Sequence, residues 1–308
     1  KEPTVPQILK KQEKFEKGTV MLYNLKKEIK PDFFSEEKVL RLCLCLRKLR
    51  HIRIEGPNVS YDVRIEENQG VRSVSINGNV HKYKVYTHNF TVSDERAISQ
   101  RDGEKERSKE QKIKFYIPLD KKSDNEGNKS YLYSGLPTEI QIKIPLIIDA
   151  PFELNTARTD VISSEASSWN NVVLNEIYAF LKVVLVALRE TDGIDVLRFL
   201  KVKREGCTYT LDLFSNEKLN QSRFLSIVKD LEILPTWKLG IFARASRDHL
   251  YRIPDWLSYA LGSGGCIRED LSAYIQCREG KYEETFNALG VKIIPSEKAV
   301  NLLKICCS

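Results

Sequence analysis

The stretch SSWNNVVLNEIYAFLKVVLVAL, residues 167–188, decides the architecture of this chain. Ser167 or Ser168 is a typical N-cap for a helix, and Asp192-Gly193 is a typical end. Between these limits apolar side chains recur at helical spacing, which indicates one continuous buried face. We expect this helix to pack across a β-sheet through a stripe made of Trp169, Val173, Ile177, Phe180, Val184 and Leu188.

The sheet itself is predicted from the residues that precede the helix. From His51 to Val92 the sequence consists of short alternating runs, separated by turn residues such as Asn68-Gln69-Gly70 and Asn77-Gly78. This texture is typical of antiparallel hairpins. Two further strands are predicted at 112–118 and 139–148. The fold class is therefore α+β, with a mixed or antiparallel sheet and packed helices.

The two ends of the chain differ from this central region. We predict a strand over 18–25, then a helix that begins after Ser35 and runs to about Arg50. Beyond residue 193 short helices and strands alternate, with candidates at 197–200, 208–211, 223–231 and 282–306. The predicted parts are 1–50, then 51–192, then a smaller α/β C-terminal domain at 193–308.

Composition favours a folded, soluble, cytoplasmic protein, with 42% hydrophobic and 30% charged residues. The most apolar run, 183–188, is soon broken by Arg189 and Glu190, so we expect no membrane span. The chain starts at Lys1 and its single methionine is Met21, so we interpret it as a fragment of a longer protein. Its seven cysteines form no zinc-binding pattern, so no metal site is predicted.

A net charge of +7 allows contact with nucleic acid but does not favour it, because the densest charged run, 101–129, mixes both signs. One mostly cationic cluster lies at residues 47–53 and comprises Arg47, Lys48, Arg50, His51 and Arg53. It is either a binding patch or, as we favour, an ordinary exposed helix end.

Arg158 is the residue with the clearest chemical potential. It lies between a predicted strand and the long helix, within the sequence Leu154-Asn155-Thr156-Ala157-Arg158-Thr159. A guanidinium offers a fixed fork of donors that matches phosphate oxygens and stabilises charge in phosphoryl transfer. The alternative is a surface arginine paired with Asp160 or Glu165.

Four short motifs, taken in order, resemble a known family. They are Gly18-Thr19-Val20-Met21-Leu22, then Tyr133 to Glu139, then Ala150 to Leu154 with Arg158, then Trp169-Asn170. Together they are similar to sacsin and its bacterial relatives, and the Arg158 segment resembles the middle domain of the ninety-kilodalton heat-shock chaperones. Threonine at 159 and alanine at 157 depart from the chaperone pattern, which has glutamate and serine there.

The resemblance covers about residues 18–190 and implies an ATPase of the gyrase, heat-shock chaperone, histidine kinase and MutL (GHKL) superfamily. It implies that 51–192 is a middle domain of the transducer, ribosomal S5 domain 2-like type. Arg158 would contact the terminal phosphate of ATP, Asn155 would position the loop or the phosphate, and Thr19 would help to order the adenine pocket. The ATP- and Mg²⁺-binding motifs of the superfamily do not occur here, so we expect neither tight ATP binding nor hydrolysis by this chain alone.

The parent protein would then be a chaperone-like, ATP-dependent conformational machine, or a bacterial defence component. Its partners would be its own N-terminal ATPase domain, a protein client bound through residues 193–308, and in one arrangement a second copy in a homodimer. Two alternatives remain. One is a DNA-binding transducer of a topoisomerase or MutL-like machine, although those typically use lysine at the phosphate. The other is a non-catalytic interaction scaffold.

Overall fold

A computed structural model describes residues 35–56, 59–93, 110–119, 130–162, 167–206, 208–220, 224–238, 241–246, 250–254, 256–257, 271–275 and 282–307. The predictions for 18–25, including Thr19, lie outside these residues. The elements of the first half are α1 Glu36–Cys43, β1 His51–Gly56, β2 Val59–Asn68, β3 Val71–Ile76, β4 Asn79–Thr91, β5 Glu110–Pro118, β6 Ser130–Ser134, β7 Leu136–Ile142, β8 Ile147–Asp149, α3 Ser168–Asp192 and the 3-10 helix η4 Gly193–Phe199.

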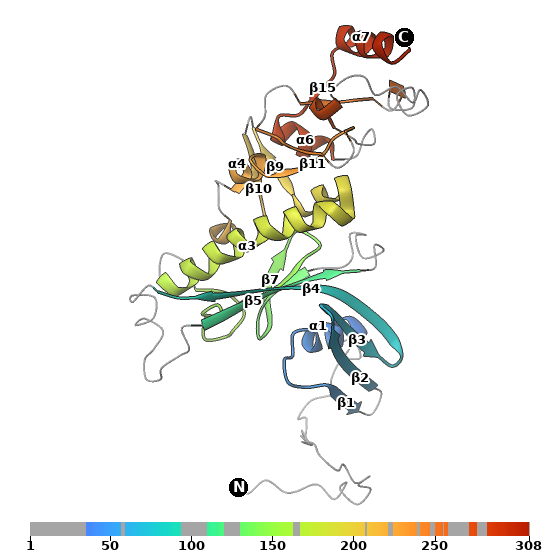
Figure 1. Ribbon diagram of the computed structural model, residues 1–308. Coiled ribbons are helices and arrows are strands. Elements are labelled where there is room, and N and C mark those ends of the chain that lie inside the picture. The colour runs from blue at the N-terminus through green and yellow to red at the C-terminus, as the bar shows by residue number, and fades with distance from the viewer. Residues whose placement is uncertain are drawn as a thin grey trace, which may run out of the picture.

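The remaining elements are shorter. They are β9 Val202–Glu205, β10 Thr208–Leu211, η5 Glu217–Leu219, α4 Phe224–Lys229, β11 Glu232–Pro235, β12 Phe242–Arg244, β13 Tyr251–Arg252, η6 Leu271–Ala273, β14 Tyr274–Ile275, α6 Glu283–Leu289, β15 Lys292–Ile293 and α7 Ser296–Cys307. Most of them lie beyond α3 on the side away from the large sheet, and α7 is the farthest (Figure 1). Phe214, just before η5, forms a bridge with Ile142 of β7.

The large sheet is mixed. Within the described residues its strand order is β1-β2-β3-β4-β5-β8-β6-β7. Strands β6 and β8 run parallel, and the other neighbours pair antiparallel. This confirms an α+β fold with a mixed sheet. The two predicted turns are tight hairpins: Gln69 and Gly70, like Asn77 and Gly78, both have positive φ, as a type I′ turn requires.

The strand predicted over 139–148 is wrong as a single element. Strand β7 ends at Ile142 and β8 begins at Ile147, and the two strands lie at different positions in the sheet. Pro145 falls in the break, where its missing N–H and fixed φ interrupt a ladder. The chain therefore leaves the edge of the sheet and returns between β5 and β6.

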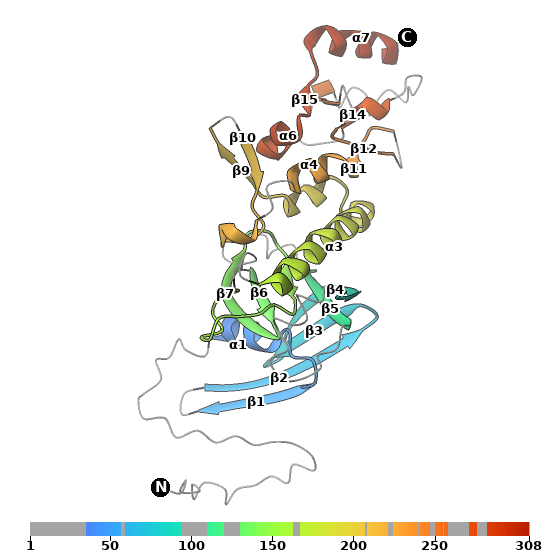
Figure 2. The ribbon, with the colours of Figure 1, turned by 90° about the vertical axis from the view of Figure 1, so that its left-hand side faces the viewer.

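Alternation along the strands gives the sheet two apolar faces. On β5, Phe115 joins the core cluster beneath α3, while the next residue, Tyr116, joins the cluster beneath α1. On β6, Leu132 and Tyr133 divide in the same way. Helix α1 thus lies on one face of the sheet and α3 on the other (Figure 2).

Helix α3 matches its prediction. Ser167 caps it by accepting from the backbone N–H of Asn170, and Gly193 ends it at φ 55°. Tyr178 on this helix also contacts Phe214 and Phe224 of the C-terminal elements, with ring centroids 6.4 and 4.7 Å apart. Among the described residues, the helical stretch Ser168–Phe199 is long and apolar enough to cross a membrane by composition alone. Here half of its most apolar part is buried inside the fold.

Helix α1 is shorter than predicted, since it ends at Cys43 and not near Arg50. Leu44 and Cys45 turn into the core, and the buried Arg72 holds the carbonyl of Leu46 through its guanidinium. Cys43, Leu44 and Cys45 are three successive buried residues, which would span more of a helix's circumference than one amphipathic face covers. The segment after α1 is therefore an irregular strap tied to the sheet.

The buried clusters cross both predicted boundaries. One cluster of buried side chains runs from Phe90 in β4 through α3 to Val291, on both sides of residue 192. A second cluster joins α1 to β2, β3 and β5 on both sides of residue 50. A third, small cluster includes Ile253, Leu257 and Leu302. The three predicted parts stay predictions.

Candidate functional site

The loop that carries Arg158 is a short hairpin. Leu154 and Val161 form an antiparallel bridge, and the N–H of Ile162 donates to the carbonyl of Glu153. At the tip, Arg158 has φ 58°, in the left-handed region. A non-glycine residue is uncommon there and costs about 1 kcal/mol or more. The side chain of Arg158 is exposed.

Asn155 orders the interior of this loop. Its Oδ1 accepts from the backbone N–H groups of Thr159 and Asp160, at 3.0 and 3.3 Å. Its Nδ2 donates to Thr159 Oγ1 at 3.1 Å, and its own carbonyl accepts from Arg158 N. An asparagine amide that closes on nearby backbone groups in this way stabilises a turn. Asn155 therefore positions the loop.

Asn170 fixes the two flanks of the same loop from the first turn of α3. It has no exposed surface. Its Oδ1 accepts from Glu153 N at 2.7 Å, while its Nδ2 donates to the carbonyls of Glu153 and Ile162 at 2.9 and 2.8 Å. The neighbouring Trp169 donates from Nε1 to Pro151 O at 2.6 Å. The helix and the arginine loop are thus one hydrogen-bonded unit.

The β6–β7 hairpin supports the loop from the other side. The register of these strands shifts between Tyr131 and Tyr133. The buried hydroxyl of Thr138 fills the interrupted ladder, donating to Leu132 O and accepting from Ile140 N. Next to it, Glu139 N donates to Thr159 O at 2.9 Å. The irregular hairpin therefore lies directly against the Arg158 loop, as bulges beside sites often do.

A pocket of about 380 Å³ opens between these elements and α1. It is lined by Arg41, Leu136, Pro137, Thr138, Glu139, Leu154, Ala157, Arg158 and Thr159. The alternative to a phosphate-binding role was an ion pair between Arg158 and Asp160, and this ion pair is not formed. Asp160 Oδ1 instead accepts from Val161 N and Asn216 Nδ2. The other predicted partner, Glu165, lies outside the described residues.

The comparisons with known proteins found no relative. No protein-family model matches the chain. No curated protein and no solved structure matches it either. The geometry of the site is therefore the ground on which its function is argued.

Sequence reasoning found Arg158 and Asn155 but assigned no role to Asn170, Thr138 or Arg41. The signal for Asn170 was present, since it stands in the first turn of a predicted helix of apolar residues, where a buried asparagine needs partners. Thr138 and Arg41 gave no such signal. Their roles depend on a register shift and on a helix packed against a strand distant in sequence.

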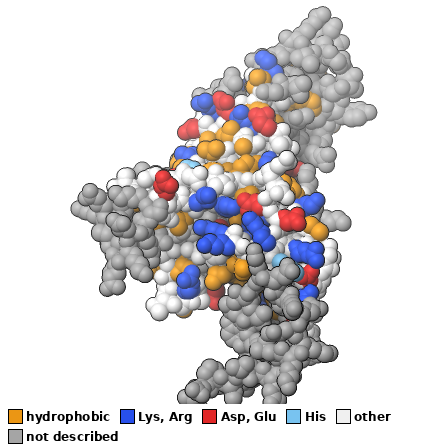
Figure 3. All heavy atoms as spheres, turned by 60° about the horizontal axis from the view of Figure 1, so that its bottom comes forward, with side chains coloured by type: hydrophobic (Ala, Val, Ile, Leu, Met, Phe, Trp, Pro, Cys, Tyr) orange, Lys and Arg blue, Asp and Glu red, His pale blue; other side chains and the backbone are white. Residues whose placement is uncertain are grey.

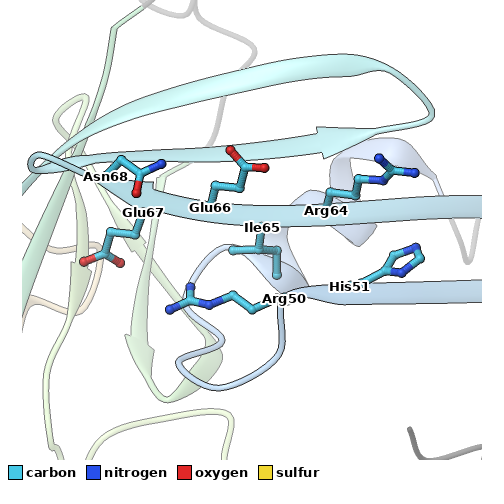
Figure 4. A pocket seen from close by; sticks show the side chains of 7 residues that line it. All are labelled: Arg50, His51, Arg64, Ile65, Glu66, Glu67 and Asn68. Atoms are coloured by element: carbon cyan, nitrogen blue, oxygen red, sulfur yellow. The ribbon is translucent and has the colours of Figure 1, made fainter. Parts of the chain in front are cut away.

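The cationic cluster at 47–53 is largely neutralised. Arg47 pairs with the buried Asp149 at 3.2 Å, His51 with Asp62, and Arg53 lies 3.9 Å from Glu55. A hydrogen bond from His51 lowers the pKa of Asp62. The hollow beside this cluster, about 520 Å³, is lined by residues of both charges, among them Arg50, Arg64, Glu66 and Glu67. Figure 4 shows Arg64 and Glu66 on one side of β2, and Glu67 on the other side with Arg50.

The wider face has mixed charge as well. Figure 3 shows Lys and Arg side chains gathered in the middle of the underside of the molecule, with Asp and Glu side chains among them and apolar side chains beside them. Residues 47–53 lie on the strap and on β1, so the prediction of an exposed helix end is wrong. Their pairing with acidic side chains favours an ordinary surface of mixed charge over a nucleic-acid patch.

The cysteines of α1 and the strap are core residues. Cys43 and Cys45 are buried and free. Burial raises the pKa of the Cys43 thiol to about 11 and raises that of Cys45 well above its ordinary value. Both thiols are therefore protonated near neutral pH and unreactive as nucleophiles. Across the described residues, no group of three or more His, Cys, Asp or Glu side chains is placed to hold a metal ion.

Proposed function

We propose that this chain is the middle and C-terminal region of an ATP-dependent conformational machine, in which Arg158 contacts the terminal phosphate of ATP bound to a GHKL-type ATPase domain. In this proposal residues 51–192 are the transducer-like middle domain of the superfamily. One observation carries it: Arg158 holds a left-handed φ of 58° at the exposed tip of a loop. Strained residues of this kind cluster at ligand-binding sites.

The loop frame supports the same role. Asn155 fixes the interior of the loop and Asn170 its flanks, so the backbone beneath Arg158 is ordered before any ligand arrives. An ordered backbone lowers the entropic cost of placing a guanidinium on a phosphate. Among the described residues, no carboxylate lies at ion-pair distance from Arg158.

The rim of the pocket suits a docking domain. Leu136, which lines the pocket, has 46% of its surface exposed. Apolar side chains beside a cation form an amphipathic surface that a neighbouring folded domain can cover. In our proposal the ATPase domain covers it and brings the nucleotide to Arg158. Cytoplasmic location and ATP with Mg²⁺ as cofactors belong to the same proposal.

The test is ATP turnover by the full-length protein with Arg158→Ala and Arg158→Lys. Alanine has a Cβ as arginine does, so the left-handed backbone is no less favourable in the variant. We expect Arg158→Ala to lose a factor of about 10³ in turnover, the scale measured for phosphate-contacting arginines. Arg158→Lys keeps the charge without the fork and should recover only part of the loss.

The matched control is Arg64→Ala, an exposed arginine on β2 that lies outside this pocket. It should leave turnover unchanged, and circular dichroism should show the same fold for every variant. If Arg158→Ala turns over ATP at the wild-type rate, the catalytic role is excluded and the scaffold alternative remains.

A further inference from the structure

Two arginines, not one, line the pocket at the Arg158 loop. Arg41 comes from α1 and Arg158 from the hairpin before α3, far apart in the sequence. We propose that Arg41 and Arg158 together form a binding site for a polyphosphate anion, a role that rests on the proposed function and extends it. Among the described residues that line this pocket, Glu139 is the single carboxylate, and it is exposed.

Arg41 is held in place at both ends. Its guanidinium stacks over the ring of Tyr131, 3.3 Å from the centroid, and donates from Nη2 to the carbonyl of Thr138. Its own carbonyl accepts from the hydroxyl of Tyr133 at 2.7 Å. A stacked, half-buried guanidinium keeps its charge and loses little freedom on binding.

Part of the Arg41 guanidinium has no described partner. Its Nη2 donates to Thr138, but Nε is buried without an acceptor among the described residues. No described carboxylate pairs with it. A partly desolvated cation without a counter-ion raises the local positive potential, and an anion in the pocket is the group that offsets this.

The size and lining of the pocket define the ligand. A volume of about 380 Å³ exceeds what a single phosphate fills and falls in the lower part of the usual range for ligand pockets. Four of the lining residues, Leu136, Pro137, Leu154 and Ala157, are apolar and offer no side-chain donors. The two cations of the lining match two adjacent phosphoryl groups. We therefore assign the site to the terminal end of a di- or triphosphate chain.

This arrangement makes the site composite. One cation belongs to the helix that precedes the strap, and the other belongs to the loop fixed by α3. A bound polyphosphate would bridge α1 to the Arg158 loop. Any movement that lifts α1 from β7 would separate the two cations and release the anion.

The experiment measures the binding of inorganic triphosphate to this chain by isothermal titration calorimetry at low ionic strength. Arg41→Gln keeps a donor for Thr138 and a planar group over Tyr131 but removes the charge. Arg158→Gln removes the second charge, and Arg64→Gln on β2 is the control. We expect the first two variants each to weaken binding about tenfold, the effect of one charge-assisted hydrogen bond. The control should bind like the wild type.

Three outcomes overturn the inference: no binding at millimolar triphosphate, equal losses in all three variants, or a loss with Arg158→Gln alone. The proposed function fails separately. If Arg41→Gln and Arg158→Gln both weaken triphosphate binding while Arg158→Ala leaves ATP turnover of the full-length protein unchanged, the anion site stands and the catalytic role falls. If turnover depends on Arg158 but triphosphate binding does not depend on Arg41, the catalytic role stands and the two-arginine site falls.

Discussion

At the scale of the residue, Asn170 offers the most direct test of how the loop is held. Its amide makes three hydrogen bonds without any exposed surface. Asn170→Ala would remove the partner of the Glu153 N–H and of the Ile162 carbonyl, while the Glu153 carbonyl would still accept from Ile162 N. We expect a loss of about 3 kcal/mol in the free energy of unfolding, measured by urea denaturation.

The control lies one residue further along the same helix turn. Asn171 is exposed, and Asn171→Ala should change the free energy of unfolding by less than about 0.5 kcal/mol. Similar losses in the two variants would contradict the role assigned to the buried amide.

Glu67 provides a pH-dependent test. Burial raises the pKa of Glu67. Hydrogen bonds from Lys114 and Arg72 lower it by more than burial raises it, so the pKa lies below the ordinary 4.5. A carboxyl whose pKa is lowered by folding contributes stability above its unfolded pKa and loses that contribution as pH falls through the folded value. Glu67→Gln should therefore destabilise the chain at pH 7, and the difference from wild type should shrink below about pH 4.

Urea denaturation at both pH values measures this, with the exposed Glu66→Gln as the control. A gap between wild type and Glu67→Gln that is the same at neutral and acid pH would show that the carboxylate charge has no part in it.

At the scale of the element, α3 contributes to the core on two sides. Phe180 packs toward the sheet, with its ring centroid 4.6 Å from Phe115 and 5.1 Å from His88. Phe180→Ala should cost about 4 kcal/mol, as large core truncations do. Val183 is 64% exposed on the same helix, and Val183→Ala should cost well under 1 kcal/mol. Thermal unfolding of the two variants compares the faces directly, and equal shifts would contradict the packing.

The elements that sequence predicts well are those whose signal is local. The cap at Ser167, the apolar stripe of α3 and the positive-φ turns at Asn77-Gly78 all depend on neighbours in the chain. Pro145 is a local signal for the break within 139–148, but the separate positions of β7 and β8 in the sheet depend on where each strand pairs, which no local pattern contains. Arg158 could be identified from its residue type and its place before the long helix. Arg41 could not, because its place in the pocket depends on α1 packing against a strand distant in sequence.

At the scale of the whole molecule, the main core continues past residue 192. Tyr178 of α3 packs on Phe214 and Phe224, so the C-terminal elements cover an apolar side of the helix. We expect a chain truncated after residue 193 to expose this side, bind a hydrophobic dye and lose a sharp unfolding transition.

A truncation after residue 295 is the matched comparison. It removes α7, whose Ala299 and Leu302 belong to the separate small cluster, and should leave the main transition intact. If the chain that ends at residue 193 unfolds as sharply as the longer one, residues 51–192 are an independent folding unit, as the predicted boundary at 192 requires.

The hydrogen bonds of Asn170 also have a consequence for descent. Because one amide fixes both flanks of the arginine hairpin, substitutions in the loop and at residue 170 are not independent during evolution. A lineage that loses the asparagine would lose the geometry that makes the arginine useful, and selection on the arginine would then relax. Among descendants of this sequence, Asn170 and Arg158 should be retained together or replaced together.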